Sequence, residues 1–510
     1  MMLTMAMMGV FSAVPADAGA YVQAKGGRFL DALGRELLLH GVNLGRKHAP
    51  YLPWAKEEDF ARFQHWGFNC LRLYTVWAAV EPEPGRFDEG YLKQLDERVA
   101  WAKAHGLHVV LDMHQDLWGE KIPGGDGAPA WATLDDGMPH ESTGDVWSAA
   151  YYMSPMVQTS FDNFWANKPL ADGVGIQDHF AAAWKHLAQR YANEPAVIGY
   201  DLINEPSLGS EFLSLVPEIL PQLAQIMGDD AGFDPIALFN SNDGMAKLTS
   251  KLDKLPAYQG LVDAAQSGVN TFEREKLAPM YRRVAAAIRE VDRNHILFFE
   301  PTELANIGVR SALPPILDAE GKPYSQQAMA PHAYDIVLDT ASMTATNEAR
   351  LELILQRHRE HAEELGLPMI IGEWGAFYGS KEAIPVARMY VRQLERVLAS
   401  ETHWEATPKI GDWAYFSSIS RPRPLAVAGR LLRYSADAAN ACFECVWKED
   451  SRIAAPSLFH LPAAWYPKGA RISVTGAGKE LQESSPSGTL SISPIPSDLE
   501  RRLSVTPEPQ

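Results

Sequence analysis

The sequence predicts an α/β fold, a (β/α)8 TIM barrel followed by a small C-terminal β-sandwich domain. Three observations indicate this fold. Apolar, β-rich runs alternate with amphipathic helices as far as residue 418, polar residues gather where those runs end, and helical periodicity gives way to short strands after residue 418. The chain of 510 residues is long enough for a large barrel and a further domain.

Eight runs are predicted as the strands of the barrel. They are residues 36–44, 69–77, 108–116, 197–206, 295–301, 328–335, 368–376 and 411–418. The segments between them have helical spacing, as in Phe180, Trp184, Leu187 and Tyr191. In such a barrel the active site lies at the carboxyl ends of the strands.

The remaining segments differ from the barrel in composition. Residues 1–18 are apolar and end in Ala16-Asp17-Ala18, which is typical of a secretory signal and predicts a secreted or periplasmic protein; the alternative is a frayed N-terminal arm. The barrel is then residues 19–418 and the β-sandwich residues 419–482. Residues 483–510 are rich in Ser and Pro and are predicted to be disordered.

The bulk composition restricts the partners of the protein. The formal net charge of −18 argues against nucleic acid and against attraction to anionic lipid. The 14 Trp and 17 Tyr residues supply aromatic faces on which sugar rings can pack. Nothing in the sequence implies a protein partner.

Two Asn-Glu-Pro triplets occur close together, and their positions separate them. Asn204 and Glu205 end a predicted strand, so they are expected at the active-site end of the barrel. Asn193 and Glu194 follow a helix and precede that strand, so they are expected in a turn at the opposite end. Glu205 is therefore the candidate for chemistry.

Two long insertions follow barrel strands and are expected to lie over the active-site end. Residues 117–178 are rich in aromatic side chains, and residues 207–270 carry an apolar stripe from Phe212 to Met227. The stripe predicts either core packing or a lipid groove. Transient contact with a membrane surface through these two insertions is a further expectation.

Glu205 and Glu373 end strands four and seven, where they can face each other across the barrel mouth. Two facing carboxyl groups, one protonated and one ionised, are what glycoside hydrolysis with retention needs. This chemistry requires no metal and no cofactor.

The stretches "DLINEP" and "IGEWG" resemble glycoside hydrolase family 5 and its clan. The resemblance implies that Glu205 is the acid/base and Glu373 the nucleophile. It further implies that Arg72 and Tyr334 hold Glu373, and that Asn204 binds the sugar 2-hydroxyl. His114 and His332 would line the sugar pocket, and Glu300 is expected to hold His332 or another site residue.

Further stretches, "NLGRKHAPY", "LDMHQDLW", "GDGAPAWA", "RPRPLAVAG" and "YPKGARI", together resemble the endoglycoceramidases over most of residues 36–475. This resemblance implies that Lys47 and Asp116 bind sugar hydroxyls. Trp413 or Phe416 would stack on the sugar, and Trp131 is a candidate for sugar contact or for the core.

The sequence therefore predicts a retaining β-glycosidase that releases glycan from ceramide in glycosphingolipids. The alternatives are a glucosylceramidase, a steryl glucosidase or a β-glucanase of the same family acting on another aglycone. A non-catalytic carbohydrate- or lipid-binding barrel is a third hypothesis, which the presence of both glutamates opposes.

Overall fold

The computed structural model describes residues 21–508 apart from residues 53, 142–143, 229–233, 477–478 and 486–487. The signal-like segment 1–18 lies outside the described residues. Within the described part of the chain, no helix combines the length and the hydropathy needed to cross a bilayer.

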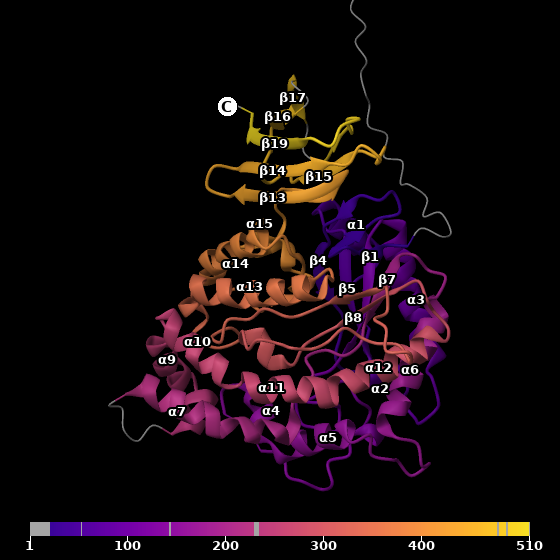
Figure 1. The fold of residues 1–510 in the computed structure, drawn as a ribbon, viewed down its shortest axis with the longest axis vertical. Helices are drawn as coiled ribbons and strands as arrows, with labels where there is room; N and C mark the ends of the chain where they lie inside the picture. The colour runs from indigo at the N-terminus through magenta and orange to yellow at the C-terminus, as the bar shows by residue number, and fades with distance from the viewer. Residues whose placement is uncertain are drawn as a thin grey trace, which may run out of the picture.

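The centre of the molecule is the predicted barrel of eight parallel strands (Figure 1). Its strands are β4 (His40–Leu44), β5 (Cys70–Val76), β6 (His108–His114), β7 (Val197–Asp201), β8 (Ile296–Phe299), β9 (Gln327–Met329), β10 (Ile370–Gly375) and β11 (Ser400–Trp404). They pair in the order β10-β11-β4-β5-β6-β7-β8-β9. A parallel bridge between Met329 and Met369 joins the two ends of this sheet and closes the ring.

Helices follow the strands and cover the outside of the ring. The main ones are α1 (Glu57–His65), α3 (Glu89–Ala104), α6 (Ile176–Tyr191), α12 (Ala278–Arg289), α13 (Glu348–Leu365) and α14 (Ile384–Arg396). Short turns of helix are α2 (Trp77–Val80), η5 (Glu303–Ile307), η6 (Met343–Ala345), η7 (Lys381–Ala383), η8 (Ile410–Asp412) and α15 (Phe416–Ile419).

The helix ends follow from local sequence. The Asn347 side chain accepts from two backbone N–H groups at the start of α13, and Gly366 ends that helix with φ +66°. The predicted face of α6, with Trp184 and Leu187, is buried against the barrel.

Both insertions contain helices, and the second is largely helical. The first carries η1 (Ala130–Ala132), η2 (Trp147–Ala149), α4 (Ala150–Met153) and α5 (Pro155–Trp165). The second carries η3 (Gly209–Leu215), α7 (Val216–Met227), α8 (Pro235–Asn240), α9 (Asn242–Lys251), α10 (Leu255–Ala264), α11 (Gln266–Phe272) and the π-helical turn η4 (Glu273–Leu277). In Figure 1 these helices lie at the end of the barrel away from the β-domain.

The prediction that residues 411–418 form the eighth barrel strand is wrong. That strand is β11, and residues 411–418 fall in η8, α15 and the turn between them. β11 reads Ser-Glu-Thr-His-Trp, which lacks the apolar pattern of a buried strand. Its buried Glu401 is paired with His40, Arg421 and Arg423. These ion pairs from distant parts of the chain compensate for the cost of burying a charged side chain in the strand.

The β-domain is a sandwich of two antiparallel sheets with a common core. One sheet has the order β1-β2-β3-β12-β15-β18 and the other β13-β14-β19-β16-β17. Its strands are β1 (Gln23–Lys25), β2 (Arg28–Leu30), β3 (Glu36–Leu37), β12 (Arg423–Val427), β13 (Gly429–Asp437), β14 (Cys442–Glu449), β15 (Ser457–Leu461), β16 (Ala470–Gly476), β17 (Lys479–Ser485), β18 (Gly488–Ile492) and β19 (Glu500–Pro507). Phe459 from one sheet packs on Trp447 from the other, with ring centroids 5.4 Å apart.

Two predicted boundaries of this domain change. Residues 23–37 were expected to belong to the barrel, but β1–β3 extend the first sheet, with β3 paired to β12. The disorder predicted for residues 483–510 is also wrong, because β18 and most of β19 pair within the sandwich. Leu503 and Val505 alternate with polar residues and are buried, and this period of two outweighs the Ser- and Pro-rich composition.

Candidate active site

The polar residues predicted at the strand ends do meet at the carboxyl end of the barrel. Glu205 follows β7, Glu300 follows β8, and Glu373 lies in β10. Asn193 and Glu194 lie in the turn between α6 and β7, as predicted, where Glu194 pairs with Lys103. The structure thus separates the two triplets as the sequence predicted.

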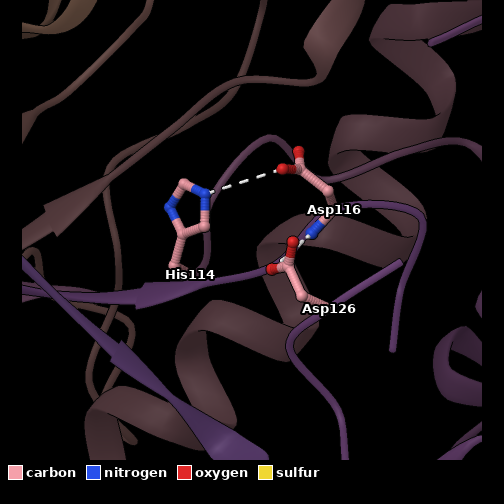
Figure 2. Close-up of side chains that lie close together, drawn as sticks. All are labelled: His114, Asp116 and Asp126. Atoms are coloured by element: carbon pink, nitrogen blue, oxygen red, sulfur yellow. Dashed lines mark hydrogen bonds and ion pairs between the residues drawn. The ribbon is translucent and has the colours of Figure 1, made fainter. Parts of the chain in front are cut away.

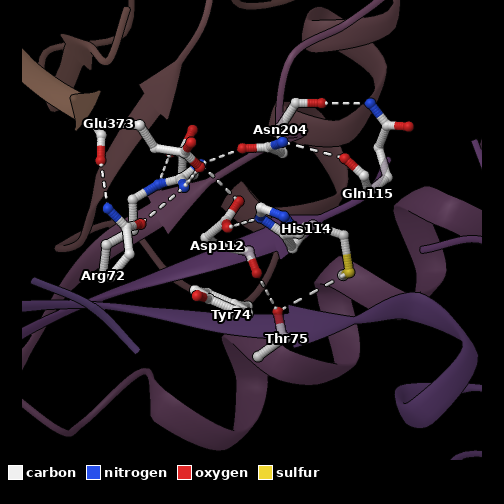
Figure 3. A network of polar contacts seen from close by, with 12 residues as sticks. Arg72, Tyr74, Thr75, Asp112, His114, Gln115, Asn204 and Glu373 are labelled. Atoms are coloured by element: carbon white, nitrogen blue, oxygen red, sulfur yellow. Dashed lines mark hydrogen bonds and ion pairs between the residues drawn. The ribbon is translucent and has the colours of Figure 1, made fainter. Parts of the chain in front are cut away.

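Arg72 on β5 is the centre of the polar network (Figure 3). Its fully buried guanidinium contacts six acceptors at 2.8–3.1 Å, on Asn43, Asp112, Asp201, Asn204, Glu300 and Glu373. Four of these are carboxylates, and their charges keep the pKa of Arg72 well above its ordinary value although burial lowers it. Arg72 is therefore a fixed positive charge beneath the site.

Glu373 is held at both carboxylate oxygens. Its Oε1 accepts from Arg72 at 2.8 Å, and its Oε2 accepts from the Tyr334 hydroxyl at 2.9 Å. Burial raises the pKa of Glu373 to about 7, although the charges of His332 and Arg72 lower it, and nearby Glu205 raises it further. The carboxyl is therefore ionised only from about neutral pH upward.

Glu205 is held differently. Its Oε1 accepts from His332 Nδ1 and from Asn306 Nδ2, each at 2.7 Å. Its backbone has φ +41°, in the left-handed region, and its N–H donates to Glu300 Oε2 at 2.9 Å. Glu300 therefore orients Glu205 through the main chain.

The two glutamates are close enough to act on one atom. One carboxylate oxygen of each, together with a ring nitrogen of His332, lies within 4.8 Å of the others. Retaining glycosidases place their carboxyl groups about 5–5.5 Å apart, and inverting ones about 6.5–9.5 Å. This closest approach agrees with the shorter spacing of retaining enzymes.

His332 lies behind the two glutamates. It was predicted to line the sugar pocket, but its ring is fully buried and contacts Glu205, Glu300 and Glu373 instead. Burial lowers its pKa, yet these carboxylates raise it, and the net pKa is well above the ordinary value. A charged imidazolium therefore lies between the glutamates at neutral pH.

A second polar group lies beside the site, built from Lys47 and the three side chains drawn in Figure 2, which are His114, Asp116 and Asp126. Lys47 forms an ion pair with Asp116, and the His114 ring points at the same carboxylate, with Nε2 at 3.8 Å. Asp126 accepts the backbone N–H of Asp116 at 3.2 Å. Lys47 and Asp116 are therefore together, and both line the cavity.

Three sets of side chains have the spacing of metal ligands among the described residues: His114, Asp116 and Asp126; Glu205, His332 and Glu373; and Asp112, Asp201 and Glu300. In each set a protein cation already pairs with carboxylates. Lys47 pairs with Asp116, and Arg72 serves the other two sets. Each set therefore contains a carboxylate that already pairs with a cationic side chain.

Trp404 is the aromatic surface that sequence reasoning missed. It ends β11, lines the cavity, and stacks on Tyr74 with the ring centroids 5.4 Å apart and the planes 9° apart. The Lys47 ammonium lies 4.5 Å from its centroid. The neighbouring Glu405 also lines the cavity and accepts from the Tyr74 hydroxyl at 2.6 Å.

Three predicted aromatic contacts are not at the cavity wall. Trp413 packs on Tyr415, and Phe416 packs on Trp66, in the segment wrongly taken as strand eight. Trp131 packs edge-on against Trp77 and donates to the Glu81 carbonyl, so it belongs to the core. Trp404, which ends the observed eighth strand, lines the cavity instead.

A cavity of about 1200 Å³ joins the strand ends to the second insertion. Its polar part includes Lys47, His114, Asp116, Asp126, Asn204, Glu205, Tyr334, Glu373, Trp404 and Glu405. Its apolar part, here called the apolar arm, includes Phe212, Val216, Ile219, Leu223, Phe239, Met245, Leu261, Val262, Leu304 and Ile307. The Phe212–Met227 stripe was predicted either to pack in the core or to form a groove. Most of its side chains line the cavity, whereas Met227 is buried in the core.

Comparison with known proteins gives the same class for both domains. Residues 30–409 match the model described as cellulase (glycosyl hydrolase family 5). Residues 421–505 match the glycoside hydrolase family 5 C-terminal domain.

Similar proteins include endoglycoceramidase I of Rhodococcus hoagii, 39% identical over 210 residues, and endoglycoceramidase of Cyanea nozakii, 28% identical over 302 residues. These matches cover 41% and 54% of this chain, but only 41% and 49% of those proteins, so the chain spans less than half the length of these relatives. Endo-glycoceramidase II from Rhodococcus sp., solved with ganglioside GM3, is 26% identical with a TM-score of 0.68 and covers 94% of this chain and 99% of that one.

Proposed function

Because the chain belongs to glycosyl hydrolase family 5, we propose that it is a retaining β-glycosidase that hydrolyses the bond between glycan and ceramide in glycosphingolipids. One observation carries the proposal. The cavity that holds Glu205 and Glu373 continues into the apolar arm, so it can receive a sugar at one end and a lipid chain at the other.

In the first step Glu373 attacks the anomeric carbon while Glu205 protonates the glycosidic oxygen. The carbon–oxygen bond to the lipid breaks, and a covalent bond to Glu373 forms. Because His332 and Asn306 both donate to Glu205 Oε1, the proton that is transferred is on Oε2. The lipid leaves as an alcohol.

In the second step water attacks the anomeric carbon. Glu205, now ionised, takes the proton from the water, and the bond between the sugar and Glu373 breaks. The imidazolium of His332 donates to Glu205 throughout and stabilises its ionised form between the two steps.

The resting protonation state follows from the surroundings of the two groups. Arg72 and Tyr334 donate to Glu373 and favour its carboxylate, although burial raises its pKa to about 7. A proton on Glu205 removes the negative charge that raises the pKa of Glu373. The contacts of Glu373 with Arg72 and Tyr334 therefore oppose the effect of burial and favour the ionised form that attacks the sugar.

The sugar binds at the polar end. The Trp404 ring offers a stacking face, and Lys47 and Asp116 offer a donor and an acceptor for ring hydroxyls. Asn204 is fixed by Arg72, which donates to its Oδ1 at 2.9 Å, and it lines the cavity where the sugar 2-hydroxyl would lie. These positions support the roles expected for them.

The apolar arm argues against a plain β-glucanase. A second sugar in that position would place its hydroxyls against Val216, Ile219 and Leu223, where they find no hydrogen-bond partner. A glucosylceramidase or a steryl glucosidase would use the same arm, so these remain the competing assignments. The similar endo-glycoceramidase II has been solved with ganglioside GM3 and as a lactosyl-enzyme intermediate, which supports cleavage behind a longer glycan.

The deciding experiment compares four substrates: glucosylceramide, ganglioside GM3, a steryl glucoside and a cello-oligosaccharide. Release of an intact oligosaccharide from the ganglioside is expected. Release of glucose alone from glucosylceramide or the steryl glucoside supports a competing assignment, and cleavage of the cello-oligosaccharide alone contradicts the proposal. A matched Glu205→Gln protein controls for contaminating hydrolases, and equal turnover by this variant would favour a non-catalytic barrel.

Contact with lipid surfaces is a related proposal. Leu213, Leu220, Ile236 and Trp147 line the cavity and are also exposed, at 55%, 37%, 59% and 43%. Substrate would enter from a bilayer at this rim, and neutral vesicles containing the glycolipid should bind wild type more tightly than an Ile236→Ser variant.

A secreted or periplasmic location is proposed on residues 1–18 alone, and fractionation of an expressing cell tests it.

A further inference from the structure

Glu303 is a buried carboxyl in the cavity wall whose hydrogen-bonding capacity is unused. It begins η5, is only 7% exposed, and lines the cavity. Neither of its side-chain oxygens makes a hydrogen bond of normal geometry among the described residues, although Ser207 and the backbone of Leu208 lie close enough to lower its pKa. Buried polar atoms in proteins nearly always have a hydrogen-bond partner. A carboxyl that lines a cavity without one can therefore bind a polar group of a ligand.

The neighbouring buried carboxyls show the contrast. Glu300, three residues earlier, uses one oxygen on Arg72 and the other on the backbone of Glu205. Glu273 is also buried; its Oε2 accepts from Ser311 and from the backbone of Ala312, and its Oε1 accepts from the backbone of Thr302. These two carboxyl groups accept hydrogen bonds from other parts of the fold, whereas Glu303 makes no hydrogen bond of normal geometry among the described residues.

Glu303 lies where the catalytic end of the cavity meets the apolar arm. Its backbone N–H donates to the carbonyl of Pro206, which follows Glu205 directly. Asn306, on the same turn of helix, donates to Glu205 Oε1. On the other side Glu303 acts electrostatically on Tyr152, whose ring packs on Phe212 of the arm at 4.4 Å.

The carboxyl of Glu303 is neutral in this setting. Burial raises its pKa to about 8, although Ser207 and the backbone of Leu208 lower it, and the charge of Glu205 raises it further. A neutral carboxyl offers one O–H donor and one carbonyl acceptor side by side. This pair complements an amide or a hydroxyl group and has nothing to bind on an alkyl chain.

We propose that Glu303 is a specificity-determining residue that hydrogen-bonds the amide and hydroxyl groups of a sphingoid aglycone next to the glycosidic oxygen. The inference depends on the proposed function and extends it to one side chain. In a ceramide the amide and the hydroxyl are on the two carbons that follow the one bearing the sugar. A sterol or a simple alkyl chain has no polar group there and leaves Glu303 unpaired.

The test measures kcat/KM on two lactosides with equally long lipid chains, lactosylceramide and hexadecyl β-lactoside. Glu303→Leu removes the polar group and keeps the volume, and it should lower kcat/KM on lactosylceramide by about 10–100-fold, the range for one or two lost hydrogen bonds. On the alkyl lactoside its activity should match wild type. Glu303→Gln keeps one donor and one acceptor and should retain the preference for ceramide.

Exposed Glu320, replaced by Leu, is the matched control and should change neither rate. An equal loss on both lactosides in Glu303→Leu would show a structural or general catalytic role and would overturn the inference. Unchanged activity on lactosylceramide would overturn it as well. A wild-type protein that cleaves the alkyl lactoside but no ceramide glycoside would instead refute the proposed function, and the inference with it.

Discussion

Replacing Tyr334 by Phe should move the acid limb of the kcat/KM profile to higher pH. The Tyr334 hydroxyl donates to Glu373 Oε2 at 2.9 Å. A donor to a carboxylate stabilises its ionised form, so loss of the hydroxyl raises the pKa of Glu373. The nucleophile must be ionised to react, and activity therefore falls as the pH drops below this pKa.

The size of the change follows from the contact. A hydrogen bond to a charged group contributes about 1.5–3 kcal/mol, and about 1.36 kcal/mol corresponds to one pKa unit. The pKa of Glu373 is raised by burial to about 7, so the midpoint of the acid limb in wild type should lie near that pH. In Tyr334→Phe it should lie about 1–2 units higher.

The assay is kcat/KM on an aryl β-lactoside between pH 5 and pH 10, at about half-unit intervals. Tyr324→Phe is the matched control, because Tyr324 packs on Arg289 away from the site and its profile should follow wild type. A Tyr334→Phe variant with lower activity but an unmoved acid limb would refute the reasoning, since the hydroxyl would then not set the ionisation of Glu373.

Three further changes test the cavity. Trp404→Ala should lower kcat/KM by at least about tenfold through loss of the stacking face, whereas Trp413→Ala should stay within about threefold; equal losses would contradict the placement of the sugar. Ile219→Asp puts a charge into the apolar arm and should raise KM at least about tenfold on lactosylceramide but not on a short aryl lactoside, and the same rise on both would argue against a lipid in the arm. Glu303→Gln should have a higher melting temperature than wild type, and the difference should grow from pH 5 to pH 9. Burial raises the pKa of Glu303 in the folded protein to about 8. The stability that wild type gains from the protonated carboxyl is therefore fully present below the ordinary pKa of a Glu and is lost as the pH rises through the folded pKa, whereas Gln cannot ionise. Thermal unfolding at the two pH values measures this, and a constant difference would contradict it.

The positions of Glu205 and Glu373 could be predicted because they are encoded locally. Glu205 and Glu373 each end an apolar run, and the barrel brings such ends together. The same logic placed Glu194 correctly at the other end. The contacts of Arg72 and Tyr334 with Glu373 were expected from the resemblance to glycoside hydrolase family 5, and both are present in the structure.

The eighth strand could not be predicted because its local pattern is polar. Glu401 and His403 are buried in β11, where long-range partners such as Arg421 and Arg423 satisfy Glu401. No window of sequence contains these partners, so Trp404 was missed. Its one local sign was an aromatic residue followed by Glu405 before a polar turn.

Glu303 was missed for a different reason. It lies in a short helical turn, and its significance depends on what does not contact it. The absence of a hydrogen-bond partner for a side chain cannot be predicted from the sequence around it. Part of the lining of the apolar arm was predicted from the sequence as an apolar stripe. Only the arrangement of the helices around the cavity shows that Val216 and Ile219 line an open volume.

The central claim is that Glu373 bonds covalently to the sugar while Glu205 moves the proton. A 2-fluoro-β-lactoside with a good leaving group slows the second step, and peptide mapping by mass spectrometry then locates the trapped sugar. The account predicts a lactosyl adduct on the peptide containing Glu373, and none in a Glu373→Gln control. An adduct on Glu205 or Glu300, or turnover that never passes through an adduct, would contradict it.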